Sequence, residues 1–389
     1  MAKKVRIKDS WIIRLLGGLF LKAKGFKVGD KYKAKKGEKI IILSNHVTNY
    51  DPMFVRYSTN RFCYTLGTDT ALSTRIGRFW LPRLGIIPKK KGIADIDSLK
   101  RMLSIAAKGG SLSIFPEGNR SYADFQYFIA DNFASLMYKL KATIVLFNIV
   151  GGFGNYPRFS KERRKGILTG KIKRVLPYEE YKDMSVEQLN GIIKNELKYF
   201  DEEVKHEFKS SKKAEYLERE FFVCPKCGHI SSLYSKGDHL YCKDCGLDVT
   251  YTEHLALESK DESFKFTKLS EWYNFQKDFV KNMGIKDEVI FKDNDVILSL
   301  VNPYVLKKTV AKGDLVLTKD TLSIGDFKIN VKDILIASPV SGTKLVFVIN
   351  KDNYEIEGND RFNALKYVLM FNKLETRMKL EKVDEYYNL

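Results

Sequence analysis

The sequence predicts an α/β domain with a largely parallel sheet flanked by helices, then a small cysteine-containing module, then a mostly-β module closed by a helix. Over residues 26–200, apolar strand-like runs alternate with stretches of helical periodicity, which is typical of a sheet layered with helices. Two Cys-x2-Cys pairs lie between residues 221 and 255. From residue 288 onward, short strand-like runs are separated by turn residues.

Residues 1–25 form a basic segment with an apolar run in its middle. Residues 1–40 hold 13 Lys and Arg against 3 Asp and Glu, about half of the chain's formal net charge of +19. Such an arm suits nucleic acid or an anionic membrane surface. The apolar run is too short for a membrane span and lacks a small-residue cleavage site, so we expect neither a transmembrane helix nor a signal peptide. It predicts an amphipathic helix that either lies in the membrane interface or packs on the domain.

The first stretch that contains candidate catalytic residues is 44–52. It follows the apolar run 40–43, which predicts a buried strand. Pro52 suits the first turn of a helix, with Asp51 as its N-cap. His46 falls on the turn between strand and helix, where side chains are presented for chemistry. A histidine accepts a proton near neutral pH, and a nearby carboxylate can hold its imidazole in the required tautomer. On its own, this spacing would favour the simpler interpretation of Asp51 as a helix cap.

A second stretch, Phe-Pro-Glu-Gly-Asn-Arg-Ser at residues 115–121, also follows a strand-like run. It brings an acid, a glycine turn and an arginine together. The two stretches, in this order, resemble the glycerolipid acyltransferase family, whose patterns are Asn-His-x4-Asp and Phe-Pro-Glu-Gly-Thr-Arg-Ser. Within that family, the chain resembles the bacterial 1-acylglycerol-3-phosphate acyltransferases. The resemblance covers about residues 26–200, which is under half of the chain.

The resemblance implies acyl transfer to a lipid hydroxyl, with His46 as general base and Asp51 holding and charge-stabilising it. It implies neither a serine or cysteine nucleophile nor a catalytic metal. The substrate-binding residues that it implies are Asn45, Lys91, Glu117, Gly118, Asn119 and Arg120.

Several of these residues have alternatives or depart from the family pattern. Lys91 stands where the family has a phosphate-binding arginine, and a lysine binds phosphate without the bidentate fork of Arg120; Lys89 and Lys90 are not excluded for the same role. Asn119 replaces the usual threonine. Asn45 serves equally well as a turn-capping amide.

The implied acceptor is 1-acylglycerol-3-phosphate, which would give phosphatidate, and the donor is an acyl-carrier protein or coenzyme A thioester. The basic surface suits both acidic donors and an anionic bilayer. We therefore expect a cytoplasmic protein that associates peripherally with the inner face of the cell membrane. Lys91, together with Leu146 where the family usually has proline, leaves another lysophospholipid or lipid alcohol open as acceptor.

After the α/β domain, the charged stretch 201–220 predicts a linker helix. The module at 221–255 then carries two Cys-x2-Cys-Gly knuckles around a hairpin-like segment. Four thiolates at this spacing predict a zinc ribbon whose Zn²⁺ is structural, because no ligand position is left for water. Its four ligands would be Cys224, Cys227, Cys242 and Cys245.

A zinc ribbon on a basic chain also raises a different class of function, that of a nucleic-acid-binding protein. The basic excess, however, lies at the N-terminus and not on the cysteine knuckles. A single-strand-binding surface would also interleave basic and aromatic residues. We therefore do not expect nucleic acid as a partner.

Residues 266–389 predict a helix followed by the mostly-β module. Trp272, Phe275 and Phe279 share one side of a helix over 266–284. Five short strands and a final helix over 360–380 follow. This order resembles a pleckstrin-homology or GRAM-like module, which would recognise a lipid headgroup or a protein.

Overall fold

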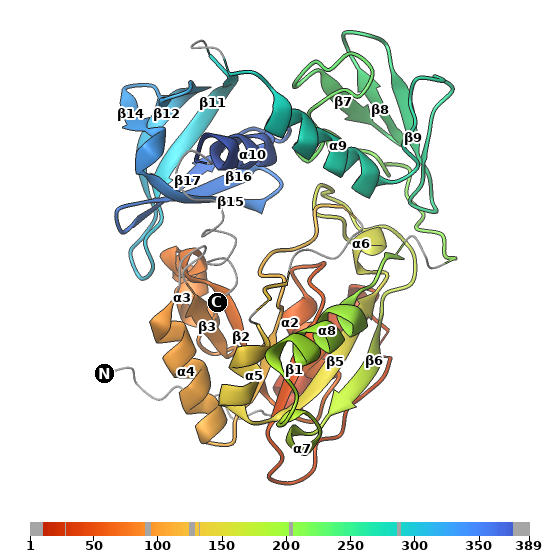
Figure 1. The fold of residues 1–389 in the computed structure, drawn as a ribbon, viewed down its shortest axis with the longest axis vertical. Coiled ribbons are helices and arrows are strands. Elements are labelled where there is room, and N and C mark those ends of the chain that lie inside the picture. The colour runs from red at the N-terminus through yellow and green to blue at the C-terminus, as the bar shows by residue number, and fades with distance from the viewer. Residues whose placement is uncertain are drawn as a thin grey trace.

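The computed structural model of the chain describes residues 11–27, 29–89, 95–123, 129–131, 133–201, 205–285 and 289–375. It has three parts (Figure 1): the α/β domain, a small four-stranded module and a seven-stranded module. The two smaller modules sit side by side above the α/β domain, with helix α9 between them (Figure 1). The predicted order of parts is therefore the order that the structure shows.

The α/β domain is built on a six-stranded sheet in the order β3-β2-β4-β1-β5-β6. Every neighbouring pair is parallel except β5 with β6, which confirms the largely parallel sheet. Parallel strands end at one common edge, so the turns that follow β1 and β4 meet there. The strands are β1 Ile40–Ser44, β2 Cys63–Thr68, β3 Ile86–Lys89, β4 Ser111–Ile114, β5 Thr143–Val150 and β6 Thr169–Leu176.

Helices cover both faces of this sheet because its central strand is apolar on both sides. Ile41 and Leu43 of β1 pack into a core with residues of α4, α5 and α8, whereas Ile40 and Ile42 pack with residues of α2. The helices of this domain are α1 Trp11–Ala23, α2 Asp51–Tyr57, η1 Asp69–Ser73, α3 Arg75–Trp80, α4 Ile96–Ala107, α5 Ala134–Leu140, α6 Gly152–Asn155, α7 Tyr178–Tyr181 and α8 Val186–Leu197.

Helix α1 forms within the predicted N-terminal segment and packs on the domain, which was one of its two predicted alternatives. Leu21 is buried, and Gly17 lies against the ring of Tyr57 in α2. Leu15 and Leu19 remain exposed on the same helix. Within the described part of the chain, no helix combines the length and apolar character needed to cross a membrane.

The predicted linker helix over 201–220 is wrong for the residues that the structure describes there. In 205–220 the only helical element is the 3-10 turn η3, Leu217–Arg219. Residues 205–210 are extended because two hydrogen bonds join Lys165 and Lys209, at 2.7 and 2.9 Å, and turns follow over 211–216. The ring of Phe208 is fully buried against Gly154 and Gly166. The segment is therefore anchored to the α/β domain both by its backbone at Lys209 and by its side chain at Phe208.

The cysteine-containing module is a four-stranded antiparallel sheet in the order β10-β9-β8-β7. Its β7–β8 hairpin is the hairpin that was predicted between the two cysteine pairs. The strands are β7 Leu233–Lys236, β8 His239–Cys242, β9 Asp248–Tyr251 and β10 Leu257–Glu258.

The last module is a seven-stranded antiparallel sheet in the order β14-β13-β12-β11-β17-β16-β15, closed by α10. All five predicted strands are present, and the sequence missed β11 and β14. The helix predicted over 266–284 is α9. The likeness to a pleckstrin-homology or GRAM-like module stays a prediction. The elements are α9 Leu269–Asn282, β11 Phe291–Leu300, β12 Lys308–Leu317, β13 Thr321–Ile324, β14 Phe327–Asn330, η4 Val331–Asp333, β15 Ile334–Ser341, β16 Lys344–Ile349, β17 Asp352–Glu357 and α10 Ala364–Glu375.

One hydrophobic core runs through all three parts. It joins the α2 side of the large sheet to the interiors of the two smaller modules. Phe159, Phe221 and Trp272 are fully buried along this path. The smaller modules are therefore fixed on the α/β domain, since separating them would expose these rings to water.

Candidate active site

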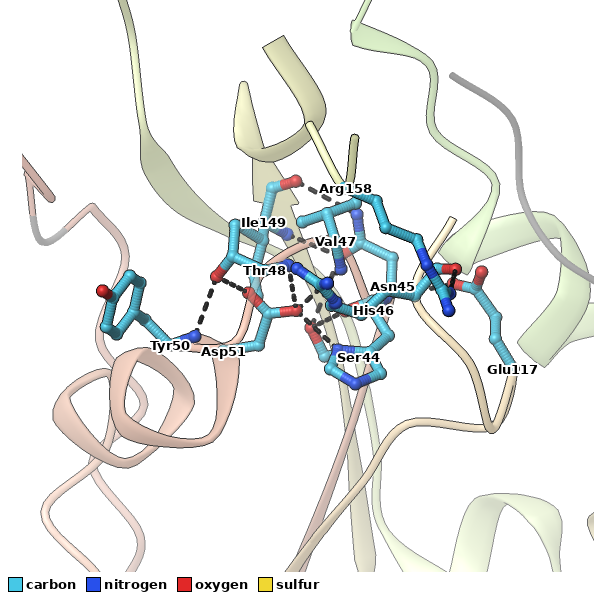
Figure 2. Close-up of polar contacts among 11 residues, drawn as sticks. Ser44, Asn45, His46, Val47, Thr48, Tyr50, Asp51, Glu117, Ile149 and Arg158 are labelled. Atoms are coloured by element: carbon cyan, nitrogen blue, oxygen red, sulfur yellow. Dashed lines mark hydrogen bonds and ion pairs between the residues drawn. The ribbon is translucent and has the colours of Figure 1, made fainter. Parts of the chain in front are cut away.

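The site is centred on His46, which lies on the turn after β1 (Figure 2). Its Nδ1 is 2.7 Å from Oδ2 of Asp51, whose side chain is fully buried, while the His46 side chain is 21% exposed. Its Nε2 makes no hydrogen bond to a described residue. One nitrogen of the imidazole is thus held by a carboxylate and the other is left for a substrate proton, which is the arrangement of a general base.

Asp51 is held in place by the turn that carries His46. Its Oδ2 accepts hydrogen bonds from the backbone N–H groups of Val47 (2.7 Å) and Thr48 (2.9 Å), and its Oδ1 accepts one from the Thr48 hydroxyl at 2.5 Å (Figure 2). The expectation that Asp51 caps α2 is wrong: Tyr50 occupies the N-cap position, and no side chain caps this end. The carboxylate is turned back onto the histidine loop, so it serves the loop and not the helix.

Asn45 ties this loop to the neighbouring strand. Its Nδ2 donates to the carbonyl of Ile149 at 3.0 Å, and its Oδ1 accepts from the Ile149 N–H at 2.7 Å. Both polar ends of the buried amide are used by the backbone of β5. The structure therefore uses the Asn45 amide to join the histidine loop to β5, and the predicted substrate contact of Asn45 stays a prediction.

The second motif lies against the first, at the end of the adjacent strand β4. Oε1 of Glu117 accepts a hydrogen bond from the His46 backbone N–H at 3.1 Å, and the Ser121 N–H donates to the His46 carbonyl at 3.0 Å. The ring of Phe115 stacks on the imidazole, with centroids 4.6 Å apart. Gly118 closes the turn with a φ of 64°, in the left-handed region that glycine adopts readily. The backbone and ring of His46 are thus fixed by the second motif.

Arg120 supplies the positive charge of the site. Its guanidinium makes no hydrogen bond or ion pair with a described residue. Removal from water, together with the neighbouring Arg158, lowers the pKa of Arg120 to about 10, while Asp51 and Glu220 oppose this shift. The group remains cationic at neutral pH and is unpaired in the described structure, as a binding site for an anion requires.

Arg158 and Glu220 lie next to Arg120. The buried Arg158 donates to the Arg120 carbonyl at 3.0 Å and to the Pro339 carbonyl of the last module at 2.7 Å. Its Nε is 3.9 Å from Oε1 of Glu220. Burial raises the pKa of Glu220 to about 8, although the surrounding arginines oppose this shift. A carboxyl whose pKa is raised in this way neutralises the neighbouring arginines less, so the cluster keeps more of its positive charge.

A cavity of about 580 Å³ opens beside Arg120. Asn49 and Tyr50 of the histidine loop form one wall, and Gly342, Thr343 and Asp360 of the last module form another. His46 is not among the lining residues. The cavity reaches the histidine loop at Asn49 and Tyr50, which lie between His46 and Asp51 in the chain. Its size is that of a small-molecule site. Six cationic side chains line it: Lys24, Arg120, Arg158, Lys161, Arg163 and Arg219.

The carboxylates that line the cavity are already neutralised by neighbours. Glu162 pairs with Lys212 at 2.9 Å, and Asp360 pairs with Lys161. The cavity therefore presents a net positive field to its contents, which favours a phosphate-bearing ligand.

The remaining predicted substrate residues are placed only in part. Asn119 is buried in the turn of the second motif. Lys91 and Lys90 lie outside the described residues. Lys89 ends β3, three strands from β1, at the same edge of the sheet as His46. Burial lowers the pKa of Lys89, and Asp95 opposes this shift.

The four predicted metal ligands come together. The sulfur atoms of Cys224, Cys227, Cys242 and Cys245 all lie within 4.8 Å of one another. The Cys224–Cys245 and Cys227–Cys242 distances are 3.6 and 3.7 Å. Zn–S bonds of about 2.3 Å in a tetrahedron would place the sulfurs roughly 3.8 Å apart. The donor set and its spacing thus fit a tetrahedral, thiolate-bound metal ion.

The two cysteine knuckles have the same backbone. Gly228 and Gly246 both have a φ of 71°. Each glycine N–H donates to the carbonyl of the first cysteine of its pair, Cys224 at 2.9 Å and Cys242 at 3.1 Å. This repeated turn brings both thiols of each pair into one cluster, and such a cluster could hold a metal ion.

Sequence reasoning missed three residues of the site: Thr48, Phe115 as a stacking partner, and Arg158. Thr48 could have been found, since a threonine between a histidine and its carboxylate is a local hydrogen-bond donor. Phe115 lies inside the second motif, but its contact with His46 depends on the sheet order. Arg158 has no local signal because its partners lie in distant segments.

A comparison with protein-family models agrees with the two motifs. Residues 25–150 match the model of the family Acyltransferase. A search of curated proteins finds no match. Among solved structures, the chain is similar to the 1-acyl-sn-glycerophosphate (LPA) acyltransferase PlsC from Thermotoga maritima, with 14% identity and a TM-score of 0.42 over 47% of this chain and 74% of that chain. The family match supports the presence of an acyltransferase domain.

Proposed function

We propose that this protein transfers a fatty acyl group from an acyl-carrier protein or coenzyme A thioester to the free hydroxyl of 1-acylglycerol-3-phosphate, giving phosphatidate. The observation that carries the proposal is the His46 imidazole, with Nδ1 held by the buried Asp51 and Nε2 left without a described partner. The acyltransferase family match over residues 25–150 supports the reaction class.

In this reaction the acceptor hydroxyl attacks the thioester carbonyl directly. Nε2 of His46 accepts the hydroxyl proton as the new C–O bond forms, and Asp51 stabilises the resulting imidazolium. The C–S bond then breaks, and the proton passes to the leaving thiolate. The step needs only a base and a bound acceptor.

The phosphate of the acceptor would bind at Arg120. This guanidinium is unpaired among the described residues and lines the cationic cavity beside the histidine loop. Arginine binds a phosphate through two parallel hydrogen bonds, which also sets the direction of the acceptor's hydroxyl. The positive field of the cavity suits another lysophospholipid as well, and this is the alternative acceptor.

We also propose that the four-cysteine cluster holds one structural Zn²⁺. Cys224, Cys227, Cys242 and Cys245 would be its ligands, and a fully sulfur-ligated ion stabilises the fold of the module. The ion takes no part in acyl transfer.

The test is acyl transfer to lysophosphatidate by the purified protein, with both thioester donors offered. Wild type should turn over, whereas His46→Ala should lose turnover while keeping its fold and its zinc. Gln188→Ala, on the far helix α8, serves as a matched purification control. Turnover by His46→Ala would remove His46 as the base; turnover with another acceptor alone would correct the substrate and keep the chemistry.

A further inference from the structure

Two segments that are far apart in the sequence expose large hydrophobic side chains next to each other. One is α3 with the turn after it, and the other is the turn between β11 and β12 with the first residues of β12. Among the described residues fourteen large hydrophobic side chains are exposed, and eight of them lie in these two segments. They are Ile76, Phe79, Trp80, Leu84, Tyr304, Val305, Leu306 and Val310. We call these residues the apolar surface.

Hydrogen bonds between the two segments make this one continuous surface. The Arg78 guanidinium of α3 donates to the Tyr304 carbonyl at 3.0 Å. The Lys307 N–H donates to the Ser73 carbonyl, in the turn η1 before α3, at 3.2 Å. The last module lies above α3 (Figure 1), so the α/β domain and the module each contribute half of the surface.

The spacing of apolar residues around α3 predicts a buried helix face, but the structure leaves that face in water. Ile76 is 75% exposed and Trp80 is 52% exposed. A contiguous apolar patch of this kind is uncommon on a protein that works alone in solution and marks a contact surface.

The charges around the apolar surface identify its partner. Residues 75–89 contain four Lys and Arg and residues 301–313 contain three, and neither segment contains an Asp or Glu. Lys307 is paired with Glu355 and Glu357 of β17, so its charge is compensated. Lys89 interacts with Asp95 and is a candidate for phosphate binding, so it is left out of the surface. The other five cations are Arg75, Arg78, Arg83, Lys308 and Lys312.

We propose that the apolar surface docks on an anionic phospholipid bilayer. Trp, Tyr and Phe favour the boundary between headgroups and acyl chains, and Lys and Arg around them attract anionic lipid. Nucleic acid would use the cations but leave the aliphatic side chains without a partner. A bilayer would contact the cations through its anionic headgroups and the apolar side chains through its acyl chains. The proposal is independent of acyl transfer, since none of these residues belongs to the His46 site.

The test is sedimentation of the full chain with phosphatidylcholine vesicles, with and without phosphatidylglycerol. Wild type should bind the anionic vesicles, and salt should weaken the binding. Trp80→Ser and Leu306→Ser should each weaken it about fivefold, since each removes a half-exposed apolar side chain from the contact. The matched control is Leu335→Ser, because Leu335 is exposed to a similar extent outside the surface.

A series of charge-reversal variants separates the electrostatic contribution to vesicle binding from the apolar contribution. Lys308→Glu should weaken binding to anionic vesicles at least fivefold, whereas Lys328→Glu, on the distant strand β14, should change it less. The proposal is overturned if wild type does not bind anionic vesicles, or if Trp80→Ser and Leu306→Ser bind like Leu335→Ser. Loss of binding only with Leu19→Ser would assign the contact to α1. Concentration-dependent dimerisation that is lost with Trp80→Ser would assign the surface to a second copy of the chain.

Discussion

Neutralising Asp51 tests how the histidine loop produces a base. In Asp51→Asn, the side-chain oxygen can take the place of Oδ2 and still accept from the Val47 and Thr48 N–H groups and from Nδ1 of His46. The amide group then occupies the Oδ1 position, next to the Thr48 hydroxyl, which can rotate to accept from it. The loop and the orientation of the imidazole should survive, and only the negative charge is removed.

The size of the effect follows from that geometry. With Nδ1 and Oδ2 2.7 Å apart, the charge centres of the imidazolium and carboxylate are separated by about 4 Å. At an effective dielectric constant near 20, their attraction is about 4 kcal/mol. Losing it when the imidazolium forms should lower kcat roughly 1,000-fold. KM for the acceptor should change little, because Asp51 does not contact the acceptor.

Steady-state acyl transfer with wild type, Asp51→Asn and Thr48→Ser measures this directly. Thr48→Ser keeps the hydroxyl that donates to Asp51, so it is the matched control and should stay within a few-fold of wild type. Thermal unfolding shows whether the loop is intact. If Asp51→Asn keeps more than a tenth of wild-type kcat with an unchanged Tm, then Asp51 does not stabilise a charged histidine and the proposed base is wrong.

Three further predictions concern the parts around the site. Cys224→Ser should lower the metal content from one zinc per chain and lower the Tm, as measured by mass spectrometry and calorimetry; stoichiometric zinc in this variant would contradict the ribbon. Between pH 4.5 and about 8, only the folded state keeps the Glu220 proton. The free energy of unfolding of wild type, measured relative to that of Glu220→Gln, should therefore fall by up to about 1.4 kcal/mol for each pH unit across this window. Parallel curves for the two proteins in urea titrations would contradict the burial of this group as a neutral acid. Gly342→Val should raise KM several-fold, because a Cβ at Gly342 would lie 2.9 Å from Cδ of Arg219 at the cavity wall. The control is Gly191→Ala on α8, where a Cβ meets nothing within 4 Å. An unchanged KM in Gly342→Val would show that the substrate does not use this wall.

The sequence was most informative where an element depends on its own residues. The run Ile40–Leu43 is apolar at every position, so both faces of its strand had to be covered, and the sheet order confirms this. His46 and Asp51 lie on one turn, and the cysteine pairs each lie on one knuckle. Local spacing fixes such geometry, so the candidate base and the metal ligands could be named from spacing and resemblance.

Features that depend on distant segments could not be predicted. The stretch 201–220 was expected to be helical because it is charged and continuous, yet the burial of Phe208 and the pairing of Lys209 with Lys165 hold residues 205–210 extended. The residues of α3 have a helical apolar pattern, and local spacing could not show that their side chains would remain exposed. Tertiary contacts override propensity in the first case. In the second, no element in the described part of the chain covers the helix face.

The contacts of Arg158 explain why the last module bears on a reaction whose motifs lie wholly in the first domain. This one buried guanidinium donates to the Arg120 carbonyl and to the Pro339 carbonyl, so it joins the second motif to strand β15. The second bond ends on a backbone carbonyl of the module, so only a correctly placed module satisfies it. The same module supplies Gly342, Thr343 and Asp360 to the cavity wall. A change in the position of the module would therefore shift the contacts of Arg120 and reshape the cavity together.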